Sequence, residues 1–282
     1  MLAKSLAVYQ DFLRQHSLAT PKWHVVLGSG FGNALGSFSW ELVGELPFSA
    51  LPALHKSTVQ DHAGAYRFYR RGNAVVSFQM GRLHGYEGLA PAAVALTVMI
   101  PRMAGVEEFL LTNASGGLTT AFQPGDVMMI RDHVNFTGQN PLTGPNPLHL
   151  NGAELGPRFP DLCDAYDAGW RERLTRSCRA RGLKVHEGIY LGVAGPSFET
   201  PAEVRLFGLW GMHAVGMSTV WEAIALRHSG AKLAGLSLIS NLGAGLGTQK
   251  LDHDTILKTS RASAASIIGA LDAAATEAFG SA

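Results

Sequence analysis

A short apolar run that ends abruptly in small residues constrains this chain most. Phe109, Leu110 and Leu111 read as the end of a buried strand, and the small residues of NASGG at 113–117 follow. Small side chains allow backbone N–H groups to close on an anion or a flat ring. Other apolar runs end in the same way, in GSGFG at 28–32, GRLHGYEG at 81–88, GPSFET at 195–200, GMST at 216–219 and SN at 240–241. We therefore expect these strand ends to converge on one pocket.

Length and composition favour a single α/β domain over 1–282. The chain has 282 residues, of which 46% are hydrophobic and 16% charged, enough to bury a large core. Lys plus Arg number 23 against 22 for Asp plus Glu, so a net charge of +1 predicts neither a nucleic-acid nor a membrane-surface partner. The longest apolar run, 89–100, is shorter than the roughly 20 residues that cross a bilayer.

The two cysteines and the N-terminus indicate a cytoplasmic protein. Cys163 and Cys178 form neither a CxxC motif nor a disulfide framework, so we expect each to be a helix-packing or surface residue. Residues 1–16 have the spacing of a surface helix and lack the apolar centre of a signal peptide.

Strand and helix patterns alternate along the chain. We expect strands at 23–27, 65–71, 74–80, 107–112, 127–130, 185–193, 214–217 and 232–240, with 65–71 and 74–80 forming a hairpin. Helices are expected at 1–16, 89–103, 166–181, 202–210, 220–228 and from about 253 onward, and loops at 47–56 and 131–164. So long a loop as 131–164 is typical of a functional segment or an interface.

The GSGFG stretch resembles a dinucleotide fingerprint but lacks its third glycine. Asn33 stands where that glycine should fall, so a nicotinamide-dependent dehydrogenase is not supported. Two alternatives stay open: a simple tight turn, or a turn in which Ser29 and exposed amides bind a small phosphate.

The octet at 81–88 gathers polar side chains. If the chain stays extended there, Arg82, His84 and Tyr86 share one face, and Glu87 on the other face could turn back to orient His84. The alternative is a solvated strand end with one stacked aromatic ring.

Taken together, these motifs identify the family. GSGFG, HAG at 62–64, GRLHGYEG, NASGG, RFPDLCDAYD at 158–167, VAGPSFET at 193–200, AVGMSTV at 214–220 and the 240–241 strand end resemble the trimeric class of purine nucleoside phosphorylases, over nearly the whole chain and in the right order. Members of that family split 6-oxopurine nucleosides with phosphate, giving free base and ribose 1-phosphate. The resemblance implies a central mixed, twisted β-sheet flanked by helices, a homotrimer, and no cofactor beyond inorganic phosphate as co-substrate.

The resemblance also implies a set of site residues. Phosphate would be bound by Ser29, His62, Arg82, His84, the backbone N–H of Ala114, and Ser218. Ribose would lie between Tyr86, Met217 and His253, with Phe159 reaching in from a neighbouring subunit. The base would contact Phe198, Glu199, Val215 and Asn241, and the catalytic roles would belong to His84, Glu199 and Asn241.

Two residues of the base site predict the substrate. A carboxylate only accepts hydrogen bonds, so Glu199 suits the N1–H of hypoxanthine or guanine and would face the N1 lone pair of adenine. Asn241 can donate to O6 or N7 of the purine. Related phosphorylases that prefer 6-aminopurines have Asp in place of this Asn, so we expect a 6-oxopurine enzyme.

Rival interpretations have less support. A methylthioadenosine phosphorylase would have a more apolar pocket at the ribose 5′ side, where His253 suits a hydroxyl. A non-catalytic nucleoside-binding protein would not need Arg82, His84, Glu199 and Asn241 together. No metal is expected, because no second His lies three or four residues from His253.

Two positions depart from the family, and Ser240, where many relatives have Thr, is the milder change. Trp221 replaces the proline of the STVPE motif, and it either shifts the following helix or adds an aromatic ring to the packing.

Overall fold

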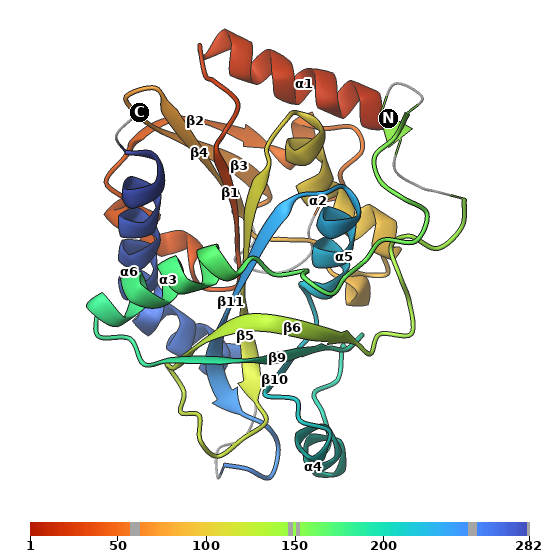
Figure 1. Cartoon of the computed structure of the whole chain (residues 1–282), viewed down its shortest axis with the longest axis vertical. Coiled ribbons are helices and arrows are strands. Elements are labelled where there is room, and N and C mark those ends of the chain that lie inside the picture. The colour runs from red at the N-terminus through yellow and green to blue at the C-terminus, as the bar shows by residue number, and fades with distance from the viewer. Residues whose placement is uncertain (57–62, 146–148, 151–152, 248–252, 281–282) are drawn as a thin grey trace.

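The fold is a nine-stranded mixed β-sheet flanked by helices, which confirms the expected class (Figure 1). A computed structural model describes residues 1–56, 63–145, 149–150, 153–247 and 253–280. The strand order is β10-β9-β6-β11-β5-β1-β4-β3-β2.

Four neighbouring strands at the centre of the sheet run parallel. They are β1 (Trp23–Leu27), β4 (Ala74–Met80), β5 (Glu108–Gly117) and β11 (Lys232–Leu242). Parallel strands end at the same edge of a sheet, and ligands of α/β proteins bind there. The ends expected to converge, near residues 28, 81, 113 and 240, therefore do lie along one edge.

Part of the sheet closes on itself. β6 (Val127–Asn135) pairs antiparallel with β11 and parallel with β9 (Val185–Gly192). β10 (Ala214–Gly216) then pairs parallel with β9 and antiparallel with the end of β5. This second pairing of β10 brings Met217 and Ser218, which follow it, back to the parallel-strand edge.

Some sequence expectations need correction. β2 (Glu41–Pro47) was not expected, because it is a largely exposed edge strand whose only buried residue is Leu46. β5 does not end before NASGG but continues through it, since β11 and β10 pair with that stretch. The expected loop at 131–164 begins as the end of β6 and contains the two-residue strands β7 (His149–Leu150) and β8 (Ala153–Glu154). The hairpin of β3 (Ala65–Arg71) with β4 is confirmed.

Three of the helices begin at residues that favour a helix start. Pro91 opens α2 (Pro91–Met103), and the Asp167 side chain caps α3 (Ala168–Ala180) by accepting from the backbone N–H of Trp170 at 2.7 Å. Thr200 and Glu203 form a capping box at α4 (Pro201–Leu209). The remaining helices are α1 (Leu2–Gln15), α5 (Val220–His228), α6 (His253–Phe279) and the short 3₁₀ segments η1 (Gly32–Ser37), η2 (Phe48–Ala50) and η3 (Gly85–Glu87).

Two helix layers cover the sheet. α3 and α6 pack together on one side, and α2 and α5 on the other (Figure 1). The Trp23 and Trp170 rings stack in the first layer with their centroids 4.7 Å apart, and the buried Cys178 lies in the same cluster, whereas Cys163 is exposed. Within the described ranges, no helix has the length and apolar character needed to cross a membrane.

Candidate active site

A cavity of about 390 Å³ opens at the parallel-strand edge. Its walls come from the segments singled out in the sequence, together with α6. The lining residues are Ser29, Arg82, His84, Tyr86, Asn113, Ala114, Ser115, Gly116, Pro196, Phe198, Glu199, Val215, Gly216, Met217, Ser218, Ser240, Asn241 and Ile256. Eleven residues predicted from sequence are therefore brought together: Ser29, Arg82, His84, Tyr86, Ala114, Phe198, Glu199, Val215, Met217, Ser218 and Asn241.

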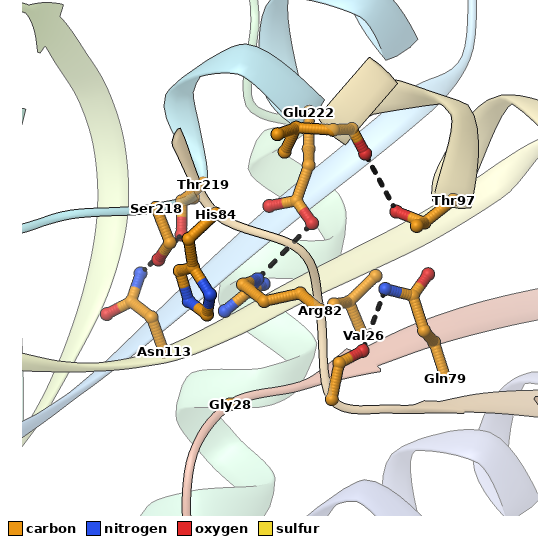
Figure 2. A network of polar contacts seen from close by, with 12 residues as sticks. Val26, Gly28, Gln79, Arg82, His84, Thr97, Asn113, Ser218, Thr219 and Glu222 are labelled. Atoms are coloured by element: carbon orange, nitrogen blue, oxygen red, sulfur yellow. Dashed lines mark hydrogen bonds and ion pairs between the residues drawn. The ribbon is translucent and has the colours of Figure 1, made fainter. Parts of the chain in front are cut away.

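Arg82 is fixed deep in one end of this cavity. Its Nε donates to Glu222 Oε1 at 3.2 Å (Figure 2). Its Nη1 donates to the Thr112 carbonyl oxygen at 2.7 Å. The side chains of Arg82 and Glu222 are 2% and 1% exposed, so the carboxylate compensates a cation that would be costly to bury alone. The guanidinium is thus held in one orientation, as binding of a tetrahedral anion requires.

His84 lies beside Arg82 and is oriented by Glu87, as the sequence predicted. Glu87 Oε1 accepts from the His84 backbone N–H at 2.8 Å and lies 3.2 Å from its Nδ1. The Tyr86 ring stacks on the imidazole with a centroid separation of 4.6 Å. Burial lowers the pKa of His84, although the neighbouring Glu87 opposes the shift. The lowered pKa favours the neutral imidazole, which can hydrogen-bond to a ligand without adding a charge.

The turn after β1 requires glycine for packing. A Cβ on Gly28 would come within 2.8 Å of the Asn113 Cα, and Gly30 has a φ of 85°. The Gly28 N–H donates to Thr112 Oγ1 at 3.0 Å, which ties the turn to β5. The 3₁₀ segment η1 follows this turn, whereas a dinucleotide fingerprint opens an α-helix. The turn instead places Ser29 at the cavity wall.

The other end of the cavity carries Glu199 and Asn241. Glu199 lies in the segment before α4, and burial raises the pKa of its carboxyl. Ser240 Oγ donates to Asn241 Oδ1 at 2.8 Å. The pairing of β11 with β5 shifts register between Ile239 and Asn241. Because of this bulge, the consecutive residues Ser240 and Asn241 both line the cavity, where a regular strand would turn one of them away.

Of the three other predicted residues, only Phe159 has a described side chain, and it is absent from the lining. His62 lies outside the described residues, and for His253, the first residue of α6, the structure describes the backbone alone. Phe159 is 85% exposed, with the Arg158 guanidinium 5.2 Å from the centre of its ring. In the described part of the chain, no cluster of three or more His, Cys, Asp or Glu could hold a metal ion.

Sequence reasoning missed the residues that support this site from behind. Glu222 was given no role, although a single carboxylate in the otherwise apolar start of α5 is a signal that it has a buried partner. From the sequence, only the backbone N–H groups of the stretch that contains Asn113 and Ser115 were expected to face a ligand, but both residues also line the cavity. Trp221 adds an aromatic ring to the packing: α5 begins at Val220, as expected, and the Trp221 Nε1 donates to Thr137 Oγ1 at 3.0 Å.

The fold and this cavity define the class of protein. The family model of the phosphorylase superfamily matches residues 37–276. The solved structure of a schistosoma purine nucleoside phosphorylase in complex with hypoxanthine superposes with a TM-score of 0.86 and 28% sequence identity, over 97% of this chain and 95% of that one. A second, of the Schistosoma mansoni purine nucleoside phosphorylase in complex with adenosine, gives a TM-score of 0.83 at 28% identity, over 96% and 94%.

The sequence comparison narrows the class. Purine nucleoside phosphorylase 1 of Geobacillus stearothermophilus is 40% identical over 249 residues, which is 88% of each chain. This chain therefore belongs to the purine nucleoside phosphorylase family, and it is an enzyme of that family.

Proposed function

We propose that this enzyme cleaves 6-oxopurine nucleosides such as inosine and guanosine, and their deoxy forms, with inorganic phosphate. The observation that carries the proposal is one cavity with two unlike ends. Arg82, His84, Ser29 and Ser218 offer donors to a phosphate at one end, and Glu199 and Asn241 offer an acceptor and a donor to a base at the other. The products are the free purine and a ribose 1-phosphate or deoxyribose 1-phosphate.

The reaction follows from this arrangement. Breaking the glycosidic bond leaves positive charge on the sugar and negative charge on the purine, by analogy with the oxocarbenium-like transition state of glycosidases. A phosphate held beside Arg82 and His84 forms the new bond to C1′ and stabilises the developing cation. Asn241 donates a hydrogen bond to the departing base as its negative charge grows.

Base selection is proposed to depend on Glu199. As a carboxylate it accepts from the N1–H of a 6-oxopurine, and adenine offers only a lone pair at N1. The Schistosoma mansoni relative in complex with adenosine indicates that this fold can admit a 6-aminopurine nucleoside. Discrimination in this chain would therefore come from polar pairing, which can reach about 10⁴ because a mismatched base leaves buried groups unpaired.

Purine release from inosine and adenosine, each with and without phosphate, tests the proposal. We expect release from inosine only when phosphate is present, and little release from adenosine. Release that is equally fast without phosphate would indicate a hydrolase, and faster release from adenosine would overturn the base site alone. Activity should also be unchanged by EDTA, since phosphate is proposed as the only co-substrate and no metal as a cofactor.

We further propose a homotrimer in which Phe159 completes the ribose site of a neighbouring subunit. An aromatic side chain that is 85% exposed and absent from the cavity lining of its own chain supports this role. Sedimentation of the active enzyme should give a trimer, and Phe159→Ala should raise the KM for inosine by about tenfold. A fully active monomer would contradict the proposal.

A further inference from the structure

Thr219 has a backbone conformation that a β-branched residue rarely adopts. Its φ is 74° and its ψ is −48°, and the Val220 N–H donates to the Ser218 carbonyl oxygen at 2.8 Å. This is a γ-turn with positive φ, a rare and strained form that persists only where surrounding contacts hold it. The turn separates Ser218 from the first residue of α5.

Asn113 makes a side-chain hydrogen bond to this turn. Its Nδ2 donates to Thr219 Oγ1 at 2.9 Å (Figure 2). Its Oδ1 accepts from Ser237 Oγ at 2.5 Å. Ser237 Oγ is in turn 2.7 Å from Ser115 Oγ. Asn113 is 1% exposed, so the two central strands β5 and β11 fix its amide on a rigid base.

The turn connects Asn113 to two groups at the phosphate end of the cavity. Thr219 Oγ1 lies 3.1 Å from Ser218 Oγ, and Thr219 is the N-cap residue of α5. Glu222, one turn into that helix, contacts Arg82. The position of Ser218 and the start of the helix that carries Glu222 therefore both depend on how Thr219 is held.

We propose that Asn113 is a positioning residue for phosphate, which acts through Thr219 to hold Ser218 and the start of α5 in place. This inference rests on the phosphate subsite of the proposed function. The alternative is that Asn113 contacts phosphate directly, since it also lines the cavity. The two hypotheses differ in one respect. Phosphate binding requires the Thr219 hydroxyl if Asn113 acts through Thr219, but not if Asn113 contacts phosphate directly.

Steady-state kinetics of Thr219 variants test the inference. Thr219→Val keeps the branched shape but loses the hydroxyl, and we expect it to raise the KM for phosphate about tenfold. The KM for inosine should change less than about threefold, because Glu199 and Asn241 lie on other elements. Thr219→Ser keeps the hydroxyl and should stay close to wild type. Thr97→Val, which removes a buried hydroxyl from α2, is the matched control and should leave both constants unchanged.

A double-mutant cycle completes the test. Asn113→Ala should raise the KM for phosphate as much as Thr219→Val does, and the double variant should be no worse than either, because both remove the same contact. An unchanged KM for phosphate in Thr219→Val, or effects of the two variants that simply add, would overturn the inference and favour direct contact. Ser218→Ala is measured alongside. If Ser218→Ala leaves the KM for phosphate unchanged, both the phosphate role of Ser218 and the inference are wrong. If Ser218→Ala raises that KM and Thr219→Val does not, only the inference is wrong.

Discussion

The Asn241 amide is fixed by its immediate neighbours. Ser240 Oγ donates to Asn241 Oδ1, and one hydrogen of Asn241 Nδ2 goes to the Leu242 carbonyl oxygen at 3.0 Å. An amide nitrogen has two hydrogens, so the second can be offered to the base. The Ser240 contact keeps the acceptor end of the amide turned to the protein, and Asn241 can therefore act as a donor toward a leaving purine.

Substitution of Asn241 should separate catalysis from base selection. Asn241→Ala should lower kcat on inosine by about 10² to 10³, the usual effect of losing a preorganised donor at developing charge. Asn241→Asp should shift preference toward adenosine, because a carboxylate accepts from the 6-amino group and repels O6. Rates on both nucleosides measure these effects, with the exposed Asn140→Asp as the control. A loss of less than tenfold in Asn241→Ala, or unchanged selectivity in Asn241→Asp, would count against the assigned role.

At the scale of elements, α5 and the segment 81–88 are packed together by Trp221. A Cβ on Gly85 would come within 2.5 Å of the Trp221 Cη2 and 2.7 Å of its Cζ3. Gly85 immediately follows His84, so the indole ring lies against the segment that positions the imidazole. Trp221, which departs from the family pattern, thus packs directly behind the cavity wall.

Gly85→Ala should therefore destabilise this protein through overpacking. We expect a loss of about 1–3 kcal/mol in the free energy of unfolding, with a lower Tm. The loss should vanish when Gly85→Ala is made in a Trp221→Ala background, where the ring is absent. Gly36→Ala is the control, because a Cβ there meets nothing within 4 Å. Equal costs of Gly85→Ala in both backgrounds would show that Trp221 is not the obstacle.

At the scale of the whole molecule, a histidine in the sheet core links stability to pH. His24 on β1 is fully buried, with Nδ1 2.8 Å from Ser77 Oγ and Nε2 3.4 Å from Gln79 Oε1. Burial lowers its pKa from 6.5 to about 3, although the contact with Gln79 opposes the shift. At a pH between about 3 and 6.5, His24 binds a proton in the unfolded chain but not in the native protein. Stability must therefore fall as pH drops below 6.5.

The size of this effect can be measured by urea unfolding. Between about pH 7.5 and about pH 5, His24 alone should cost about 2 kcal/mol of stability. His24→Gln cannot take up the proton, so its stability should fall by that much less over the same interval. Both proteins must be compared at one concentration if the enzyme is oligomeric. An identical fall in the two proteins would contradict the assigned pKa.

Much of the fold and of the site could be predicted from the sequence because the signals are local. Apolar runs that end in small or polar residues predicted most of the strands and the convergence of their ends on one pocket. Glu87 was expected to turn back toward His84, and it does so through the 3₁₀ turn η3, whereas the alternation had assumed an extended chain over 81–88. The motifs named most of the cavity lining. β2 was missed because an exposed edge strand with one buried residue has no clear period, and the continuation of β5 was missed because it depends on pairing with distant strands.

By itself, the sequence determined which residues could carry the chemistry, since donors, acceptors and chain direction are properties of each residue and its neighbours. Only the tertiary structure decided how those residues are held. Three features depend on contacts between positions far apart in the chain. They are the bulge that turns both Ser240 and Asn241 to the cavity, the burial of Arg82 against Glu222, and the hydrogen bond from Asn113 to Thr219. Such contacts leave no periodic signal in the sequence, because they exist only once the strands and helices have packed.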